Sequence, residues 1–87
     1  MTIYRAFEVK EGKTWRETYR TEDRAKVYED LANELMNCKV FHSNYYTKME
    51  QHNNYDGTRT IIFYQKLGHG STVGSSTVGR SVYRVKD

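Results

Sequence analysis

The sequence predicts a small α+β domain in which one helix lies across one face of an antiparallel β-sheet. Residues 21–38 have apolar side chains at three- and four-residue spacing, which is the period of an amphipathic helix. The segments on both sides of this stretch alternate apolar and polar residues, as strands do. The chain has 87 residues and no proline, so nothing in it interrupts the ladders of a single sheet. The predicted order is strand, strand, helix, strand, strand, with a fifth strand as an option.

The first two strands are predicted to form a hairpin. Residues 3–10 (IYRAFEVK) and 14–20 (TWRETYR) each alternate, although Arg5 interrupts the apolar positions of the first. A short turn around Gly12 joins them. One face of the second strand is expected to carry every other residue: Trp15, Glu17 and Tyr19.

The helix is predicted over residues 21–38 (TEDRAKVYEDLANELMNC). Thr21 is a suitable N-cap, because its hydroxyl accepts a hydrogen bond from a backbone N–H of the first turn. Glu22 and Asp23 then place negative charge at the positive end of the helix dipole. Its apolar stripe consists of residues three or four apart: Ala25, Tyr28, Leu31, Ala32, Leu35 and Met36. Such a helix is not stable alone, so we expect the strands to cover the stripe.

Two further strands are predicted after the helix. Residues 40–48 (VFHSNYYTK) form the first, in which the neighbours Tyr45 and Tyr46 point to opposite faces, so one of them is expected to be exposed. Residues 49–57 are polar and rich in turn formers, which predicts a long exposed loop. Residues 58–67 (TRTIIFYQKL) are the clearest strand in the sequence.

The C-terminal part of the chain has a different composition. We therefore expect a core domain over residues 1–67 and a separate C-terminal segment over residues 68–87. Residues 68–79 (GHGSTVGSSTVG) have the composition of a flexible linker or of a loop that is ordered by contact. Residues 80–86 (RSVYRVK) alternate and favour a fifth strand at an edge of the sheet, since their apolar side chains would otherwise be exposed. A basic arm that is mobile until it binds a partner is the alternative.

Charge is distributed unevenly along the chain. The whole chain has a net charge of +3, whereas residues 21–38 carry two basic and five acidic residues. The helix is therefore acidic and the remainder is basic. If the helix covers one face of the sheet, the opposite face attracts an anionic partner. Ordinary surface variation is the alternative interpretation.

No motif predicts a cofactor, a metal site or a catalytic centre. In the Gly-rich stretch 68–79 no Lys follows a Gly and no helix follows the stretch, which excludes the usual phosphate-binding loops. The candidate soft metal ligands are scattered and lack the paired spacing of zinc sites: Cys38, His42, His52 and His69. Cys38 with His42 is also the one nucleophile–base pair close in sequence, and no group that would orient the imidazole lies nearby. We therefore expect a protein that is not an enzyme and holds no cofactor.

The chain shows no apolar run as long as a membrane span and no signal peptide. Its one cysteine cannot form an internal disulfide, which favours a reducing, cytoplasmic location.

Aromatic residues make up 14% of the chain and include eight tyrosines, and they are interleaved with Arg and Lys. Tyr, Trp and Arg carry much of the binding energy at protein interfaces. Rings flanked by basic residues also bind single-stranded nucleic acid. We expect these residues to contact a partner: Trp15, Arg16, Tyr45, Tyr46, Arg59, Arg80, Tyr83 and Arg84. A strand at the edge of the sheet, either 3–10 or 80–86, could also pair with a strand of a partner protein or of a second copy of the chain.

In type, the chain resembles the small early proteins of bacteriophages, which bind and disable host machinery such as polymerases, nucleases or CRISPR effectors. The features that carry this resemblance are the short single domain, the segment MTIYRAFEVKEGKTWRETYR running straight into the helix, the abundance of Tyr and the lack of a catalytic motif. The resemblance implies a non-catalytic inhibitor that occludes a surface of a larger host protein. A small single-stranded nucleic-acid-binding protein that uses the same exposed residues is the alternative.

Overall fold

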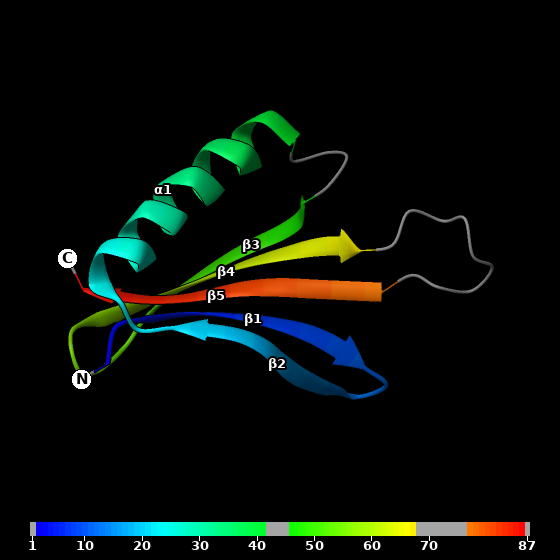
Figure 1. Ribbon diagram of the computed structural model, residues 1–87, viewed down its shortest axis with the longest axis horizontal. Coiled ribbons are helices and arrows are strands. Elements are labelled where there is room, and N and C mark those ends of the chain that lie inside the picture. Colours follow the sequence, from blue (N-terminus) through cyan, green and yellow to red (C-terminus); the bar gives the residue numbers. More distant parts are fainter. Residues whose placement is uncertain (1, 42–45, 68–76, 87) are drawn as a thin grey trace.

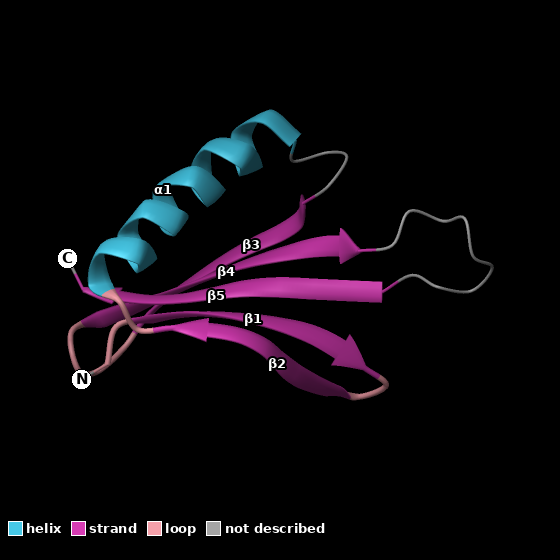
Figure 2. Ribbon diagram, in the orientation of Figure 1, coloured by secondary structure: helices cyan, strands magenta, loops and turns pink. Residues whose placement is uncertain are grey.

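A computed structural model describes residues 2–41, 46–67 and 77–86 (Figure 1). The elements in chain order are β1 (Tyr4–Glu11), β2 (Thr14–Thr21), α1 (Arg24–Phe41), β3 (Tyr46–Asn53), β4 (Thr58–Leu67) and β5 (Thr77–Lys86). The strands form one antiparallel sheet in the order β2-β1-β5-β4-β3, and α1 lies on one side of it (Figure 2). The predicted α+β class is confirmed, including the fifth strand.

β5 is the central strand of the sheet, so its predicted position at an edge is wrong. It pairs with β1 on one side and with β4 on the other. The reason is visible in its side chains, because Tyr83 and Val85 are 0% and 1% exposed and Val82, on the other face, is 9% exposed. A strand that buries residues on both faces gains most from neighbours on both sides. The edges are β2 and β3, and neither segment predicted as an edge lies at one.

The first hairpin is confirmed, with one local difference. Gly12 closes its turn with φ of 62°, a conformation that favours glycine. The register shifts beside Glu8, so Thr18 is an extra residue on β2 and forms a β-bulge. Tyr19 therefore lies on the helix side of the sheet, whereas Trp15 and Glu17 lie on the opposite side. The shared face predicted for these three side chains is wrong for Tyr19.

The helix begins later and ends later than predicted. Asp23 is its N-cap, because its Oδ1 accepts a hydrogen bond from the Ala25 N–H at 3.1 Å. Thr21 is instead the last residue of β2, and its hydroxyl accepts the Asp23 N–H at 3.3 Å. At the other end the helix continues past Cys38 to Phe41.

These changes shift the segment that follows. The strand predicted over residues 40–48 is helical at residues 40–41, and residues 42–45 lie outside the described part of the chain. β3 begins at Tyr46 and continues to Asn53, so the predicted loop over residues 49–57 is wrong for its first five residues. Polar side chains at an edge strand face solvent without penalty, which is why this strand reads as a loop in the sequence.

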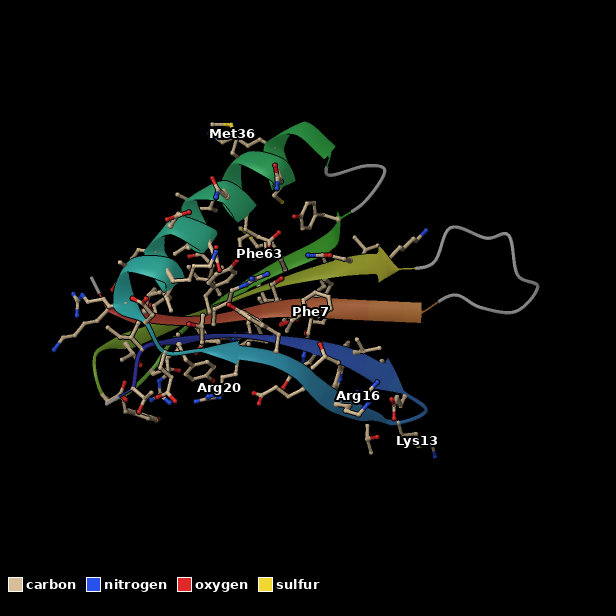
Figure 3. The ribbon with its side chains drawn as sticks, viewed as in Figure 1. Phe7, Lys13, Arg16, Arg20, Met36 and Phe63 are labelled. Atoms are coloured by element: carbon tan, nitrogen blue, oxygen red, sulfur yellow. The ribbon has the colours of Figure 1, made fainter. Side chains whose placement is uncertain are left out.

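The core lies between α1 and the centre of the sheet. The buried residues that form it come from the helix and three strands: Val27, Leu31, Tyr46, Ile61, Phe63, Tyr83 and Val85. The rings of Tyr46, Phe63 and Tyr83 pack edge to face in series, with centroid distances of 6.1 and 5.7 Å. Leu35 and Met36 of the predicted apolar stripe are 40% and 62% exposed, and Figure 3 shows Met36 pointing away from the sheet.

A carboxylate takes part in this core. Glu34 is 7% exposed and accepts hydrogen bonds from the hydroxyls of Tyr83, at 3.1 Å, and of Tyr46. Arg5 lies beside it, with one terminal nitrogen 3.9 Å from Glu34 and the other 3.2 Å from Asp30. Arg5 therefore interrupts the apolar pattern of β1 because it supplies the positive charge that a buried carboxylate requires. Burial and the nearby charge of Glu34 raise the pKa of Tyr83.

We expect Tyr83→Phe to lower the free energy of unfolding by about 2 kcal/mol, because it removes a donor to a buried charged acceptor. Tyr55→Phe is the matched control, since Tyr55 is fully exposed and its change should stay within about 0.5 kcal/mol. Urea denaturation followed by circular dichroism measures both values. Equal stability of the two variants would show that Glu34 does not depend on the Tyr83 hydroxyl.

Candidate functional site

No described helix or strand covers the sheet face opposite α1 (Figure 2), and we call this face the open face. Directly opposed residues of antiparallel strands share a face, so the pairing register defines its members. They are Trp15, Glu17 and Arg20 of β2; Tyr4, Ala6, Glu8 and Lys10 of β1; Val78, Arg80, Val82, Arg84 and Lys86 of β5; Thr58, Thr60, Ile62, Tyr64 and Lys66 of β4; and Lys48, Glu50 and His52 of β3.

An aromatic and cationic cluster lies on the open face. The guanidinium carbon of Arg80 is 4.0 Å from the ring centroid of Trp15, which is stacking distance. The Tyr64 ring meets Trp15 edge to face at 6.2 Å, and the Lys10 ammonium is 5.9 Å from the same indole. Arg80 Nε also donates to Glu8 Oε1 at 2.6 Å. The cluster joins side chains from four strands, and Arg80 is held in place by a ring and a carboxylate together.

The open face has an excess of positive charge. Seven of its residues are basic, namely Lys10, Arg20, Lys48, Lys66, Arg80, Arg84 and Lys86, against the three carboxylates of Glu8, Glu17 and Glu50. All three arginines are paired, Arg80 with Glu8, Arg20 with Glu17 and Arg84 with Asp56. The lysines at positions 10, 66 and 86 form no ion pair with any described residue. The field at this face is therefore positive and comes mainly from unpaired lysines.

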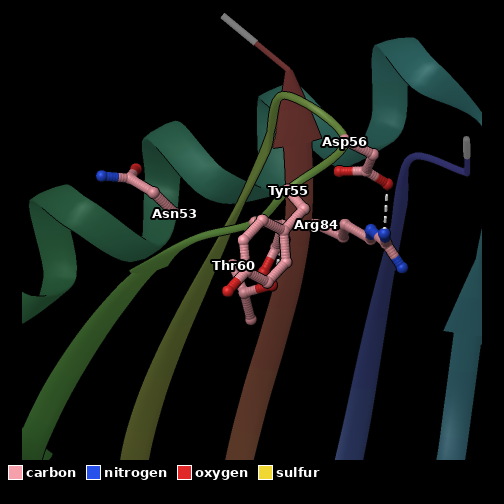
Figure 4. A pocket seen from close by; sticks show the side chains of 6 residues that line it. Asn53, Tyr55, Asp56, Thr60 and Arg84 are labelled. Carbon is pink, nitrogen blue, oxygen red and sulfur yellow. Dashed lines mark hydrogen bonds and ion pairs between the residues drawn. The ribbon is translucent and has the colours of Figure 1, made fainter.

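The turn between β3 and β4 borders an open hollow of about 410 Å³ (Figure 4). Asp56 in this turn accepts hydrogen bonds from the Thr58 hydroxyl and from the Thr58 N–H, the latter at 3.0 Å. Its other oxygen lies 2.5 Å from an Arg84 nitrogen. The two Thr58 hydrogen bonds, followed by Arg84, lower the pKa of Asp56 to about 2. The Tyr55 ring stands above the hollow and is fully exposed.

Three of the predicted contact residues lie on the open face: Trp15, Arg80 and Arg84. Sequence reasoning did not select Tyr64 or Glu8, which complete the cluster around Trp15. The alternation within β4 could have identified Tyr64 as a residue of the open face. A strand that buries residues 61 and 63 on one face presents residues 62 and 64 on the other.

The other five predicted contact residues lie elsewhere or outside the described chain. Tyr46 and Tyr83 are 7% and 0% exposed under the helix, so the expectation that their rings are surface anchors is corrected. Arg59 lies on the helix side, opposite Val85. Arg16 is exposed near the tip of the first hairpin (Figure 3), and its pairing with Val9 places it on the helix side. Tyr45 lies outside the described residues.

The candidate catalytic and metal-binding side chains do not assemble into a site in the described chain. Cys38 is partly buried against the core, and His42 lies outside the described residues. Glu8 and Glu17 face each other across the first hairpin, and each is paired with an arginine. Among residues 2–41, 46–67 and 77–86, no three side chains of His, Cys, Asp or Glu are grouped to hold a metal ion.

Comparisons with protein-family models, with curated proteins and with solved structures find no match to this chain. In the described residues no helix is both long and apolar enough to cross a membrane. What the chain does is therefore inferred from its own side chains.

We expect stability to depend on the ionisation of Asp56. Its pKa in the folded protein is about 2, against an ordinary value of 3.8. The carboxylate therefore contributes stability that is complete above about pH 4 and is lost as the pH falls through about 2. Urea unfolding measured over this range should show the loss in the native protein and a smaller one in Asp56→Asn. An Asp56 carboxyl that titrates by NMR at its ordinary value would contradict the assignment.

Proposed function

We propose that this protein is a non-catalytic interaction protein that binds an acidic surface of a larger protein through its open face. The observation that carries the proposal is the cluster of Trp15, Tyr64 and Arg80 on a sheet face that no described helix or strand covers. Trp, Tyr and Arg are the residues most enriched among those that dominate binding energy at interfaces. The proposed contacts are Trp15 and Arg80 at the centre, with Arg84 at the border of the Asp56 hollow.

The cluster is organised before a partner arrives. The Arg80 side chain is only 22% exposed and is held by the Trp15 ring and by the Glu8 carboxylate. A side chain that is already ordered loses little conformational entropy on binding, so more of its contact energy appears as affinity. Its Nε is used by Glu8, and the terminal nitrogens form no hydrogen bond with a described residue. These nitrogens are available as paired donors to a carboxylate of the partner.

Charge favours an acidic partner. Of the unpaired lysines of the open face, Lys10 is part of the cluster, Lys66 lies beside it and Lys86 is at the far end of β5. They attract a negatively charged surface over a distance of about 10 Å at moderate ionic strength. By the resemblance in type to phage early proteins, we assign the partner to the nucleic-acid-processing machinery of a host cell. In that assignment the protein acts by covering a surface that its partner needs.

Direct binding of single-stranded nucleic acid is the second candidate function. Rings and lysines on one open sheet face favour it, because bases stack on exposed rings while basic residues contact the phosphates. One observation favours the protein partner instead. One face of the Trp15 ring is already covered by Arg80, which leaves less of it for a base.

We expect Trp15→Ala and Arg80→Glu to weaken binding to the partner by about thirtyfold or more, because each removes a central contact. The partner is first captured from host lysate on the immobilised protein and identified, and affinities are then measured with the purified components. Arg16→Glu is the matched control, since Arg16 neighbours Trp15 in sequence but lies on the other face of the sheet. Full affinity of Arg80→Glu, with its fold verified by circular dichroism, would overturn the proposal.

We also expect no gel shift of mixed-sequence single-stranded DNA or RNA at low salt. A protein that neutralises several phosphates binds at low salt and loses affinity steeply as salt rises. A shift that shows this salt dependence and disappears in Trp15→Ala would establish the second candidate function in place of the first.

A further inference from the structure

The two edges of the sheet differ in how they are protected. On β2 the bulge at Thr18 lies in the middle of the strand, and a bulge disrupts the ladder that another strand would join. On β3 the irregularity lies at the start, between Tyr46 and Lys48, and pairing from Lys48 to Asn53 is regular. Every β3 residue after Tyr46 is exposed except Glu50, which is partly buried. Among the described residues none pairs with the outer side of β3.

β3 is complementary in charge to a second copy of itself. When two copies of a strand pair antiparallel about a two-fold axis, the residue at the axis stands opposite its own copy. A residue one position before it stands opposite the residue one position after it in the other copy, and opposed residues share a face. With Met49 at the axis, Lys48 of each copy stands opposite Glu50 of the other, which gives two pairs of opposite charge on the open face. With Glu50 at the axis, the two Glu50 carboxylates oppose each other. With Gln51 at the axis, Glu50 opposes His52, which is charged only when protonated.

Pairing about Met49 also covers exposed apolar surface of β3. Met49 lies on the helix side of β3, opposite Phe63, and is 42% exposed. Leu35 is 40% exposed, and the helical period places it on the flank of α1 away from Asp30 and its partner Arg5 on β1. Pairing about Met49 brings the two Met49 side chains together and places the two helices on the same side of the joined sheet.

From these observations we propose that the protein forms a two-fold dimer in which the β3 strands of two copies pair antiparallel about Met49. The dimer has one continuous sheet of ten strands. Both open faces lie on the same side of it, so the cationic clusters around Trp15 and Arg80 form one extended surface. Opposite-charge cross-strand pairs and the buried methionines stabilise the dimer, and like charges in this position destabilise it.

Dimerisation is tested by exchanging the charges of Lys48 and Glu50, which oppose each other across the two-fold axis. Analytical ultracentrifugation of the full chain from micromolar to millimolar concentration should show a concentration-dependent dimer. Lys48→Glu alone and Glu50→Lys alone place like charges opposite each other, and each should weaken self-association by about tenfold or more. An equal mixture of these two variants restores both opposite-charge pairs and should form a heterodimer. The double variant K48E/E50K should dimerise like the native protein.

Lys66→Glu is the matched control, because it makes the same charge change on the open face of the inner strand β4 and should leave dimerisation intact. The mixing experiment also separates pairing from folding, since a variant that had lost its fold would not recover in the mixture. A native protein that stays monomeric at all concentrations would overturn the proposal. A mixture that associates no better than either single variant would overturn it as well.

Discussion

The position of α1 on the sheet depends on the contacts of the Glu34 carboxylate. This carboxylate lies under the helix and meets side chains from four strands, namely Arg5 of β1, Tyr46 of β3, Gln65 of β4 and Tyr83 of β5. A buried charge is tolerated only when its oxygens are satisfied, so few orientations of the helix are compatible with it. The apolar core around it is small, and the polar contacts determine where on the sheet the helix lies.

This placement separates the two sides of the molecule. The helix brings Asp30 and Glu34 toward the sheet, where Arg5 and the tyrosine hydroxyls satisfy them. The opposite side has more basic than acidic residues and also carries Trp15 and Tyr64. An antiparallel sheet does not need cover on both faces, so the open face is stable in water and also accessible to a partner. The proposed function follows from this one-sided architecture, whereas the proposed dimer follows from the unpaired edge of β3.

The tyrosines show how one residue type serves both sides. Tyr83 and Tyr46 bury their rings in the core and use their hydroxyls to satisfy Glu34. Tyr64 lies on the open face, and its hydroxyl bond to Glu50 lowers the pKa of that carboxyl. Tyr55 is in full contact with solvent at the turn. A ring with a polar tip fits all of these environments, so composition alone does not separate core from surface.

What the sequence determined by itself was local. The first hairpin, the central turns of the helix and the strand at residues 58–67 follow from periodicity and turn chemistry, which act between near neighbours. The tertiary structure alone decided that β5 lies at the centre, that β2 and β3 are the edges, and that the ring of Tyr83 is buried while Trp15 faces outward. Strand order and register join residues far apart in the chain, and one bulge reverses the faces of all the residues beyond it. That is why the α+β class was predictable, whereas most of the candidate site was not.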